Sequence, residues 1–172
     1  MPGQPSDWVL RFAPRIPVGG TVLDLPCGRG RHTRLLLDRG HAVVAVDIDT
    51  SHIADLAGRV GLEVIETDLE DGRPFPLISR QFAGVVVTAY LYRPLLADIV
   101  AAVAPGGLLI YETFARGQER FGRPTSPDFQ LLPGELLDAV RGQLRVMAYE
   151  DLEVETPRPA VLQRLCAVRE TG

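Results

Sequence analysis

The chain has 172 residues, of which 46% are hydrophobic and 23% charged, and these values are typical of one globular domain with a buried core. Its net charge of −4 argues against nucleic acid as an obligatory partner, because proteins that bind nucleic acid usually present a basic face. Every basic residue is arginine, which excludes a lysine nucleophile, and the two cysteines, Cys27 and Cys166, show no spacing typical of a zinc site or a disulfide framework, so we expect no metal.

The sequence contains neither the apolar core of a signal peptide nor the roughly 20 apolar residues that a helix needs to cross a bilayer. We therefore expect a cytoplasmic protein that does not bind a membrane and that is a monomer or a homodimer. The whole chain, residues 1–172, is predicted to form a single domain, with residues 1–19 as an N-terminal helix and lead-in.

Strands and helices alternate through the first part of the chain. The hydrophobic and turn patterns predict, in chain order, a helix over 6–13, a strand over 21–25, a helix over 30–39, a strand over 42–47, a short helix over 51–58 and a strand over 62–66. These early strands are nearly continuous apolar runs, which is typical of strands that are covered on both faces.

The second part of the chain continues this alternation and then ends differently. The pattern predicts a strand over 82–88, a helix over 92–103 that stops at the PGG of 105–107, a strand over 108–113, a helix over 133–141, and strands over 144–152 and 160–168. The last two strands are too close together for a helical crossover, so they should be antiparallel to each other. Together these elements predict an α/β fold, a three-layer α/β/α sandwich around a mostly parallel sheet.

A glycine turn, VLDLPCGRGRHT at residues 22–33, joins the first strand to the next helix. Gly28 and Gly30 would allow the backbone to approach a ligand closely, and the N–H groups at the start of the helix favour negative charge. These features alone suit any nucleotide-like cofactor.

Three acidic residues narrow the choice of cofactor. Asp24 ends the first strand and can accept hydrogen bonds from an ammonium group, and Asp47 ends the second strand and can accept both ribose hydroxyls. Asp68 follows the third strand and can accept a hydrogen bond from an adenine amino group, with Leu69 against the ring. An ammonium, a ribose and an adenine describe S-adenosylmethionine better than a dinucleotide. Thr33 agrees, because the dinucleotide fingerprint has glycine or alanine at its position.

Each of these carboxylates also has a purely structural interpretation. Asp24 can cap the glycine turn, Asp47 can be a solvated strand end, and Asp68 can be a turn residue. Their placement after three successive strands favours the cofactor site over three separate structural roles.

The sequence resembles the class I S-adenosylmethionine-dependent methyltransferases. VLDLPCGRG resembles their first motif, VVAVDID their acidic second motif and IETDLED their adenine-side third motif, and APGGLLIYET is similar to their strand after the PGG turn. The resemblance covers about residues 20–115 and implies a Rossmann-like sheet of seven strands with an antiparallel last strand. Through residues 112–137 the chain looks most like the small bacterial branch grouped with tellurite-resistance-type methyltransferases.

The resemblance implies S-adenosylmethionine as the cofactor, with S-adenosylhomocysteine as the product. The residues that we expect to bind it are Asp24, Pro26, Cys27, Gly28, Gly30, Asp47, Ile48, Asp68, Leu69 and Thr88. Pro26 stands where the family usually has glycine. If that position has an ordinary φ, Pro26 only stiffens the turn, which is the interpretation we favour. If it needs a positive φ or an N–H group, binding is impaired.

The transferred methyl group should project past residues 88–94, where candidate catalytic residues gather: Tyr90, Tyr92 and Arg93, together with His32 from the glycine turn. His32 is either a general base or a structural donor to a backbone carbonyl. One tyrosine should lie in the core and the other in the pocket wall. Arg93 either binds an anionic substrate or pairs with an acidic neighbour.

Residues 115–130 are predicted to form a lid over the substrate, since water exclusion favours such chemistry; a basic surface loop is the alternative. We expect the substrate to contact Glu112, Phe114, Arg120 and Arg123. The predicted function is methyl transfer by in-line displacement to an unidentified small molecule. One alternative is a non-catalytic sensor or regulator that binds S-adenosylmethionine. The other is a NAD-dependent oxidoreductase, against which Asp24 and Thr33 argue.

Overall fold

The computed structural model describes residues 2–172, so Met1, the first residue of the predicted domain and lead-in, lies outside the described residues. One sheet of seven strands has the order β3-β2-β1-β4-β5-β7-β6. The strands are β1 Thr21–Asp24, β2 Ala42–Asp47, β3 Leu62–Glu66, β4 Phe82–Thr88, β5 Val103–Phe114, β6 Arg145–Val154 and β7 Ala160–Val168. β7 is antiparallel to both of its neighbours and the other pairs are parallel. The predicted mostly parallel sheet with an antiparallel last strand is confirmed.

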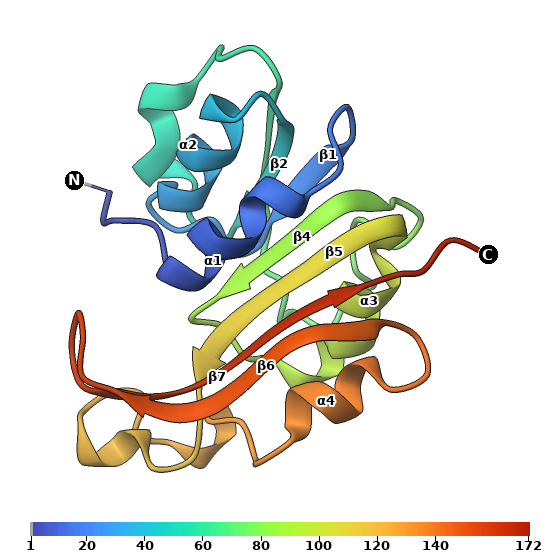
Figure 1. Cartoon of the computed structure of the whole chain (residues 1–172). Helices are drawn as coiled ribbons and strands as arrows, with labels where there is room; N and C mark the ends of the chain where they lie inside the picture. The colour runs from blue at the N-terminus through green and yellow to red at the C-terminus, as the bar shows by residue number, and fades with distance from the viewer. Residues whose placement is uncertain (1) are drawn as a thin grey trace.

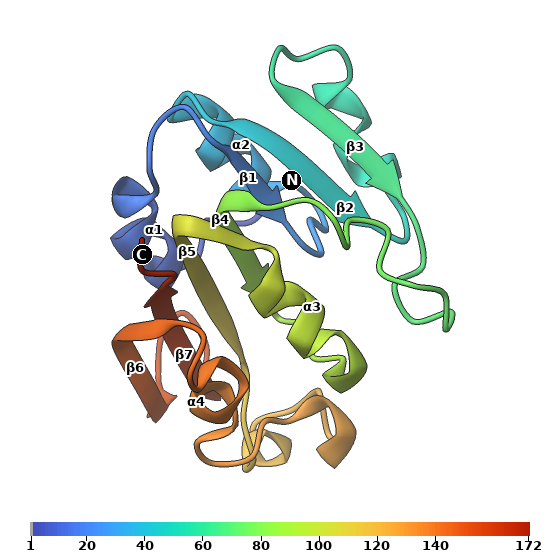
Figure 2. The same ribbon diagram turned by 90° about the vertical axis from the view of Figure 1, so that its right-hand side faces the viewer.

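Helices cover both faces of the sheet, which confirms the predicted three layers (Figure 1). Helices α1 (Asp7–Phe12) and α2 (Arg31–Asp38) pack on one face. Helices α3 (Leu96–Ala101) and α4 (Glu135–Val140) pack on the other, as the turned view shows (Figure 2). The described helices are all too short or too polar to cross a membrane.

Alternation along the central strands builds two cores. In β4, Val86 faces Trp8 of α1 and Leu36 of α2, whereas Val85 and Val87 face the α3 and α4 side. All of these side chains are buried, and burying a side chain of this size contributes on the order of 1.5–3 kcal/mol to stability. The apolar runs of the sequence are therefore explained by a sheet that is covered on both faces.

Two local expectations differ from the structure in detail. The short helix predicted over 51–58 is a 3-10 helix, Ser51–Leu56, kinked at Ile53, and Ile53 and Leu56 turn inward to pack beneath the glycine turn. The PGG of 105–107 lies inside β5 rather than before it, and a register shift between Phe82 and Gly84 in β4 accommodates this irregular stretch.

The ends of two other helices also differ from the prediction. The helix expected over 92–103 is a 3-10 turn, Arg93–Leu95, followed by α3, which ends at Ala101. Helix α4 begins at Glu135 rather than at residue 133, because Gly134 adopts a φ of +76° and serves as its N-cap. These differences leave the order of the elements unchanged.

Strand order reverses between β1 and β4, whose carboxyl ends are Asp24 and Thr88. In open α/β sheets the crevice beyond such a reversal is where ligands bind. The glycine turn, the segment after β4 and the end of β5 all meet at this edge.

Candidate functional site

The glycine turn uses its two glycines for different purposes. Gly28 and Gly30 have φ values of +52° and +76°, a region that favours glycine. A Cβ on Gly30 would lie 2.6 Å from Cγ2 of Ile53, whereas a Cβ on Gly28 would meet no atom within 4 Å. Gly30 therefore packs against the protein, and Gly28 faces open space that a ligand can fill.

Asp47 fixes the turn from the neighbouring strand. One of its carboxylate oxygens accepts the N–H of Gly28 at 2.8 Å, and the other accepts the N–H of Asp49 at 3.2 Å. Asp47 also lines a cavity of about 280 Å³, which we call the β2–β3 cavity. Its lining brings together most of the predicted adenosine-binding residues: Pro26, Asp47, Ile48, Thr67, Asp68, Leu69, Glu70 and Tyr90.

A second cavity, of about 360 Å³, lies on the other side of Pro26, and we call it the loop cavity. It is lined by Gly3, Pro26, Cys27, Gly28, Arg29, Arg31, His32, Thr88 and Ala89. The predicted residues Cys27, Gly28 and Thr88 thus lie together. Pro26, which follows a cis peptide bond, lines both cavities and separates them.

Asp24 lies behind the turn rather than in either of these cavities. Its side chain is buried, and it accepts a hydrogen bond from the Thr33 hydroxyl at 2.6 Å. Burial raises the pKa of Asp24 to about 7, and the bond from Thr33 opposes that rise. In this structure Asp24 supports the first turn of α2 through Thr33 rather than capping the glycine turn, and its contact with the cofactor stays a prediction.

Cys27 packs beneath the turn. Its N–H donates to the carbonyl of Val46 at 2.8 Å, and burial raises the pKa of its thiol to about 12. A thiol that stays protonated at neutral pH is not a nucleophile, so Cys27 contributes packing and backbone.

His32 cannot act as the general base that the sequence suggested. The side chain is 2% exposed, and its Nε2 accepts the N–H of Ser6 at 3.0 Å, which leaves Nδ1 to face the Thr88 hydroxyl at 3.4 Å. Burial lowers the pKa of His32 to about 3. The His32 ring is neutral and its lone pair is occupied. His32 therefore holds the N-terminal segment in place, and it does so as a hydrogen-bond acceptor rather than as the expected donor to a carbonyl.

Ala89 follows β4 and was not identified from the sequence. It has a φ of +52°, the one positive φ at a non-glycine residue within residues 2–172, and its N–H donates to the carbonyl of Glu112 at 2.9 Å. This conformation costs on the order of 1–2 kcal/mol for an L-residue. Ala89 lines the loop cavity and both further cavities described below, so the strained residue lies where three cavities meet. Alanine itself gives no signal for such a conformation.

Tyr90 and Tyr92 are both partly buried and both pack against the core on the α3 and α4 side. The Tyr90 hydroxyl is buried without a hydrogen-bond partner, and burial, reinforced by the neighbouring Glu70 carboxylate, raises its pKa above the usual value. Tyr90 lines the β2–β3 cavity and a larger cavity beyond it. Tyr92 lines none of these four cavities, and its catalytic role stays a prediction.

Arg93 is committed to structural contacts. Its guanidinium binds the Glu135 carboxylate through Nε and Nη2 at 2.6 and 3.0 Å, and it donates to the carbonyls of Asp128 and Gln130 at 2.9 and 3.0 Å. All three of its nitrogens are used, so the acidic-neighbour interpretation is correct and the anion-binding one is wrong. Arg93 fastens residues 115–130 to the end of β4.

Buried glutamines hold the same segment at other points. The Gln118 side chain accepts the N–H of Val161 at 2.9 Å and donates to the carbonyl of Arg123 at 3.2 Å. The Gln130 side chain donates to the carbonyl of Pro124 at 2.8 Å. In this structure residues 115–130 are held in place by polar contacts and form a wall, and their movement as a lid stays a prediction.

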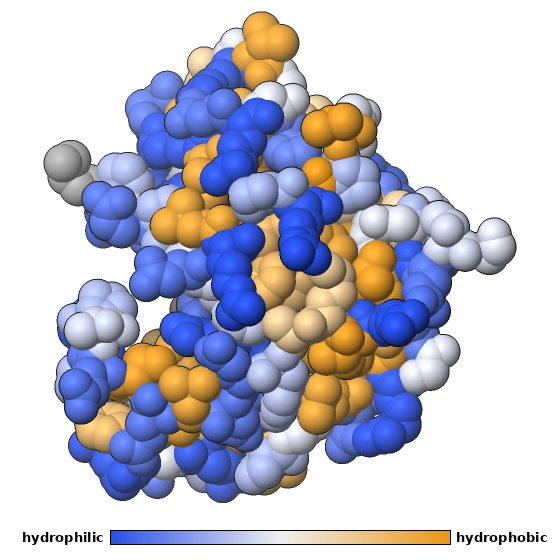
Figure 3. Space-filling model, in the orientation of Figure 1, coloured by the Kyte–Doolittle hydropathy of each residue, from blue (hydrophilic) through white to orange (hydrophobic). Residues whose placement is uncertain are grey.

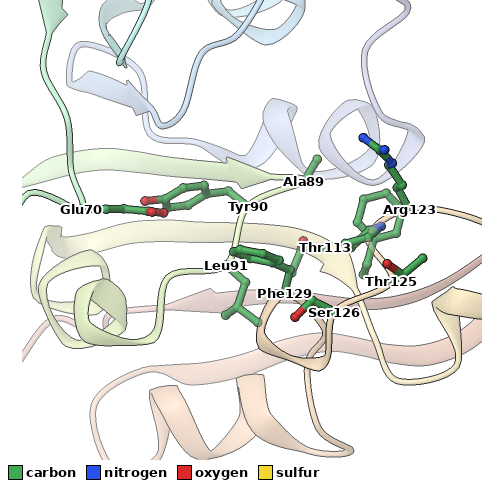
Figure 4. Close-up of a pocket in the computed structure, with 11 residues that line it drawn as sticks. Glu70, Ala89, Tyr90, Leu91, Thr113, Arg123, Thr125, Ser126 and Phe129 are labelled. Atoms are coloured by element: carbon green, nitrogen blue, oxygen red, sulfur yellow. The ribbon is translucent and has the colours of Figure 1, made fainter.

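That wall bounds a cavity of about 570 Å³, which we call the β4 cavity (Figure 4). Its lining includes the predicted residues Phe114 and Arg123, and the full set is Glu70, Ala89, Tyr90, Leu91, Thr113, Phe114, Arg123, Pro124, Thr125, Ser126 and Phe129. Arg120 lines neither this cavity nor the next one, because its guanidinium pairs with Glu153 of β6. This structure gives no support to the predicted substrate contact of Arg120, which stays a prediction.

The fourth cavity, of about 480 Å³, lies between residues 4–7 and the β6–β7 hairpin, and we call it the hairpin cavity. The molecular surface is hollowed between these segments (Figure 3). Glu112 and Phe114 line this cavity, but the Glu112 carboxylate is paired with Arg164 at 2.6 Å. Within residues 2–172 no group of three or more histidine, cysteine or acidic side chains is placed to hold a metal.

The sequence profile of a family described as "Methyltransferase domain" matches residues 22–107, half of the chain. The chain belongs to this methyltransferase family. The matched span contains the glycine turn, Asp47, Asp68 and the end of β4. The cofactor of this protein is therefore S-adenosylmethionine, as the sequence motifs implied. The alternative of a NAD-dependent oxidoreductase is thereby set aside.

Three known proteins illustrate the relationship. A 2-heptyl-1-hydroxyquinolin-4(1H)-one methyltransferase of Mycobacteroides abscessus is 28% identical over 123 residues, which cover 65% of this chain and 54% of that protein. The chain spans about half the length, or less, of the curated relatives that it matches.

Two solved structures share the fold. TehB from Haemophilus influenzae superimposes with a TM-score of 0.71 at 19% identity, over 96% of this chain and 62% of that one. The 1,6-didemethyltoxoflavin-N1-methyltransferase of Burkholderia thailandensis, with bound 1,6-didemethyltoxoflavin and S-adenosylhomocysteine, gives 0.65 at 19% identity, over 88% and 72% of the two chains.

Proposed function

We propose that this protein transfers the methyl group of S-adenosylmethionine to a small organic acceptor by in-line displacement. The observation that carries the proposal is the arrangement of the four cavities. Pro26 lies between the two cavities on the cofactor side, and Ala89 lines both the loop cavity and the two that remain for an acceptor.

The β2–β3 cavity suits the adenosine part of the cofactor. Asp47 lies at the end of β2, where its carboxylate can accept the ribose hydroxyls. Ile48 is 65% exposed on the cavity wall, and with Leu69 it offers apolar surface to an adenine ring. Asp68 uses one carboxylate oxygen for the N–H of Glu70, and the other can accept from the adenine amino group.

The loop cavity suits the methionine part. Gly28 gives it an open backbone wall, and Thr88 lines it from the end of β4. Arg31, which sequence reasoning did not single out, lies here in the first turn of α2, and its charge and the helix N-terminus both favour a carboxylate. Asp24 acts from behind by holding that turn through Thr33.

When bound, the cofactor would supply an electrophilic methyl carbon on a sulfonium, to which the acceptor atom would donate an electron pair while the carbon–sulfur bond breaks and a neutral thioether leaves. The protein's residues supply position, which can be worth on the order of 7–11 kcal/mol in such a reaction. His32 is neutral with an occupied lone pair and Cys27 stays protonated, so neither is a base. An acceptor that is already nucleophilic suits this site best.

A small acceptor is supported by the size of the cavities and by a relative. The β4 and hairpin cavities, of about 570 and 480 Å³, fall in the range typical of small-molecule sites. The Mycobacteroides relative is named for a hydroxyquinolone acceptor.

A methyl-transfer screen tests the proposal. The protein is incubated with S-adenosylmethionine and a panel of small hydroxyl, thiol and amine compounds that includes 2-heptyl-1-hydroxyquinolin-4(1H)-one, and release of S-adenosylhomocysteine is followed. We expect release above the acceptor-free rate with at least one compound. Tight cofactor binding with no release across a broad panel would contradict the transferase and favour a sensor or regulatory protein that binds S-adenosylmethionine.

A further inference from the structure

We propose that the acceptor is an aromatic molecule with a negatively charged group, bound in the β4 cavity with its ring over Leu91 and Phe129 and its charge at Arg123. This inference rests on the proposed function, and it names the class of molecule that this cavity is built to take.

The middle of the β4 cavity is apolar and aromatic. Leu91 is buried in its floor, and Phe129 is 51% exposed although it lines a cavity wall. Tyr90 and Phe114 add two further rings to the lining. A flat ring placed here would cover the exposed face of Phe129, and offset or edge-to-face contacts between aromatic rings are favourable beyond simple burial.

The two ends of the cavity carry opposite charges. Figure 4 shows Glu70 and Tyr90 at one end, Arg123 and Thr125 at the other, and Leu91 and Phe129 between them. Glu70 and Arg123 are the charged residues of the lining. An anionic group is therefore repelled from the Glu70 end and attracted to the Arg123 end, which orients an asymmetric acceptor.

Arg123 is free to take this role, unlike its neighbours. The guanidinium groups of Arg93 and Arg120 form ion pairs with Glu135 and Glu153, respectively. Within residues 2–172 the Arg123 guanidinium makes no ion pair and no hydrogen bond. An unpaired guanidinium fork at the end of an apolar cavity matches a carboxylate or a similar planar anion.

The main chain at Arg123 is also fixed in advance. The side chains of Gln118 and Gln130 bind the carbonyls of Arg123 and Pro124, so the backbone that carries the cation does not need to be ordered on binding. Less entropy is lost when such a preorganised group binds its ligand.

The hairpin cavity is the competing location for an anion, because it contains Arg31 and Arg158. It also contains Asp7, however, and its third arginine, Arg164, is paired with Glu112 and Glu150. Positive and negative groups are mixed along that lining, whereas the β4 cavity keeps them at opposite ends.

Binding of two matched probes to protein saturated with S-adenosylhomocysteine tests the inference. Naphthalene-2-carboxylate and naphthalene-2-carboxamide share a ring system and differ in charge, and each is titrated by calorimetry. We expect the wild-type protein to bind the carboxylate about fivefold more tightly, a size typical of a partly exposed charge-assisted contact. Arg123→Gln should abolish the preference, and Arg123→Lys should keep part of it.

Arg120→Gln is the matched control, because Arg120 lies three residues away in the same segment and faces Glu153 instead of the cavity. It should keep the full preference for the carboxylate. S-adenosylhomocysteine affinity, measured first for each variant, reports that the fold is intact.

Three outcomes would overturn the inference. No preference of the wild-type protein for the carboxylate, despite normal S-adenosylhomocysteine binding, would overturn this inference alone. Loss of the preference in Arg158→Gln rather than in Arg123→Gln would move the anion to the hairpin cavity. Failure of the wild-type protein to bind S-adenosylhomocysteine at all would instead overturn the proposed function, and this inference with it.

Discussion

Gly30→Ala is expected to lower the free energy of unfolding by about 3 kcal/mol. A Cβ at a φ of +76° costs on the order of 1–2 kcal/mol, and forcing it against a packed neighbour costs on the order of 1–3 kcal/mol more. The neighbour cannot move away cheaply, because Ile53 is buried and its branched side chain has few allowed rotamers. Equilibrium denaturation in urea measures the loss.

Gly28→Ala is the matched control for this effect. The φ of +52° at Gly28 carries a similar conformational cost, but the added Cβ meets no protein atom within 4 Å. We expect a loss of only about 1 kcal/mol in stability together with weaker S-adenosylhomocysteine binding, since the new methyl group projects into ligand space. Equal destabilisation by the two substitutions would show that the contact between Gly30 and Ile53 does not matter.

Asp47→Ala is expected to weaken S-adenosylhomocysteine binding at least tenfold, which corresponds to about 1.4 kcal/mol. The substitution removes the acceptor for the ribose hydroxyls and also the acceptor that holds the N–H of Gly28 at 2.8 Å. Isothermal titration calorimetry gives the affinity directly.

Asp49→Ala separates this effect from a general loss of negative charge. Asp49 lies two residues further on, accepts the N–H of Ser51 at 2.9 Å and is absent from the lining of the β2–β3 cavity. Its replacement should leave the affinity nearly unchanged. An Asp47→Ala variant that binds as tightly as wild type would contradict the assignment of this carboxylate to the cofactor.

The order of elements was predictable because most of its signals are local. The ranges predicted for β2, β3 and β4, residues 42–47, 62–66 and 82–88, agree with the observed strands. β2 and β4 are apolar runs with a sharp boundary, and β3 alternates apolar and acidic residues as an edge strand does. The kink and the 3-10 form of the short helix within 51–58 were not predictable because they depend on a distant partner. Ile53 turns inward and packs against Gly30, and the sequence of the segment itself does not predict that contact.

The residues of the candidate site likewise divide into those that local sequence signals predicted and those whose roles depend on distant partners. Asp47, Ile48, Asp68 and Leu69 were found because parallel strand ends meet at one edge, so position along the chain suffices to bring them together. The roles of His32, Arg93 and Arg120 depend on partners 26, 42 and 33 residues away, at Ser6, Glu135 and Glu153. Those pairings decide which side chains remain free to bind a ligand, and only the folded chain reveals them.

The most direct test of the cofactor assignment is the melting temperature of the protein with S-adenosylhomocysteine and, in parallel, with NAD at the same concentration. A ligand that binds only the folded state raises the melting temperature. We expect S-adenosylhomocysteine to raise it and NAD to leave it unchanged. A rise with NAD and none with S-adenosylhomocysteine would contradict the assignment of the β2–β3 and loop cavities to S-adenosylmethionine.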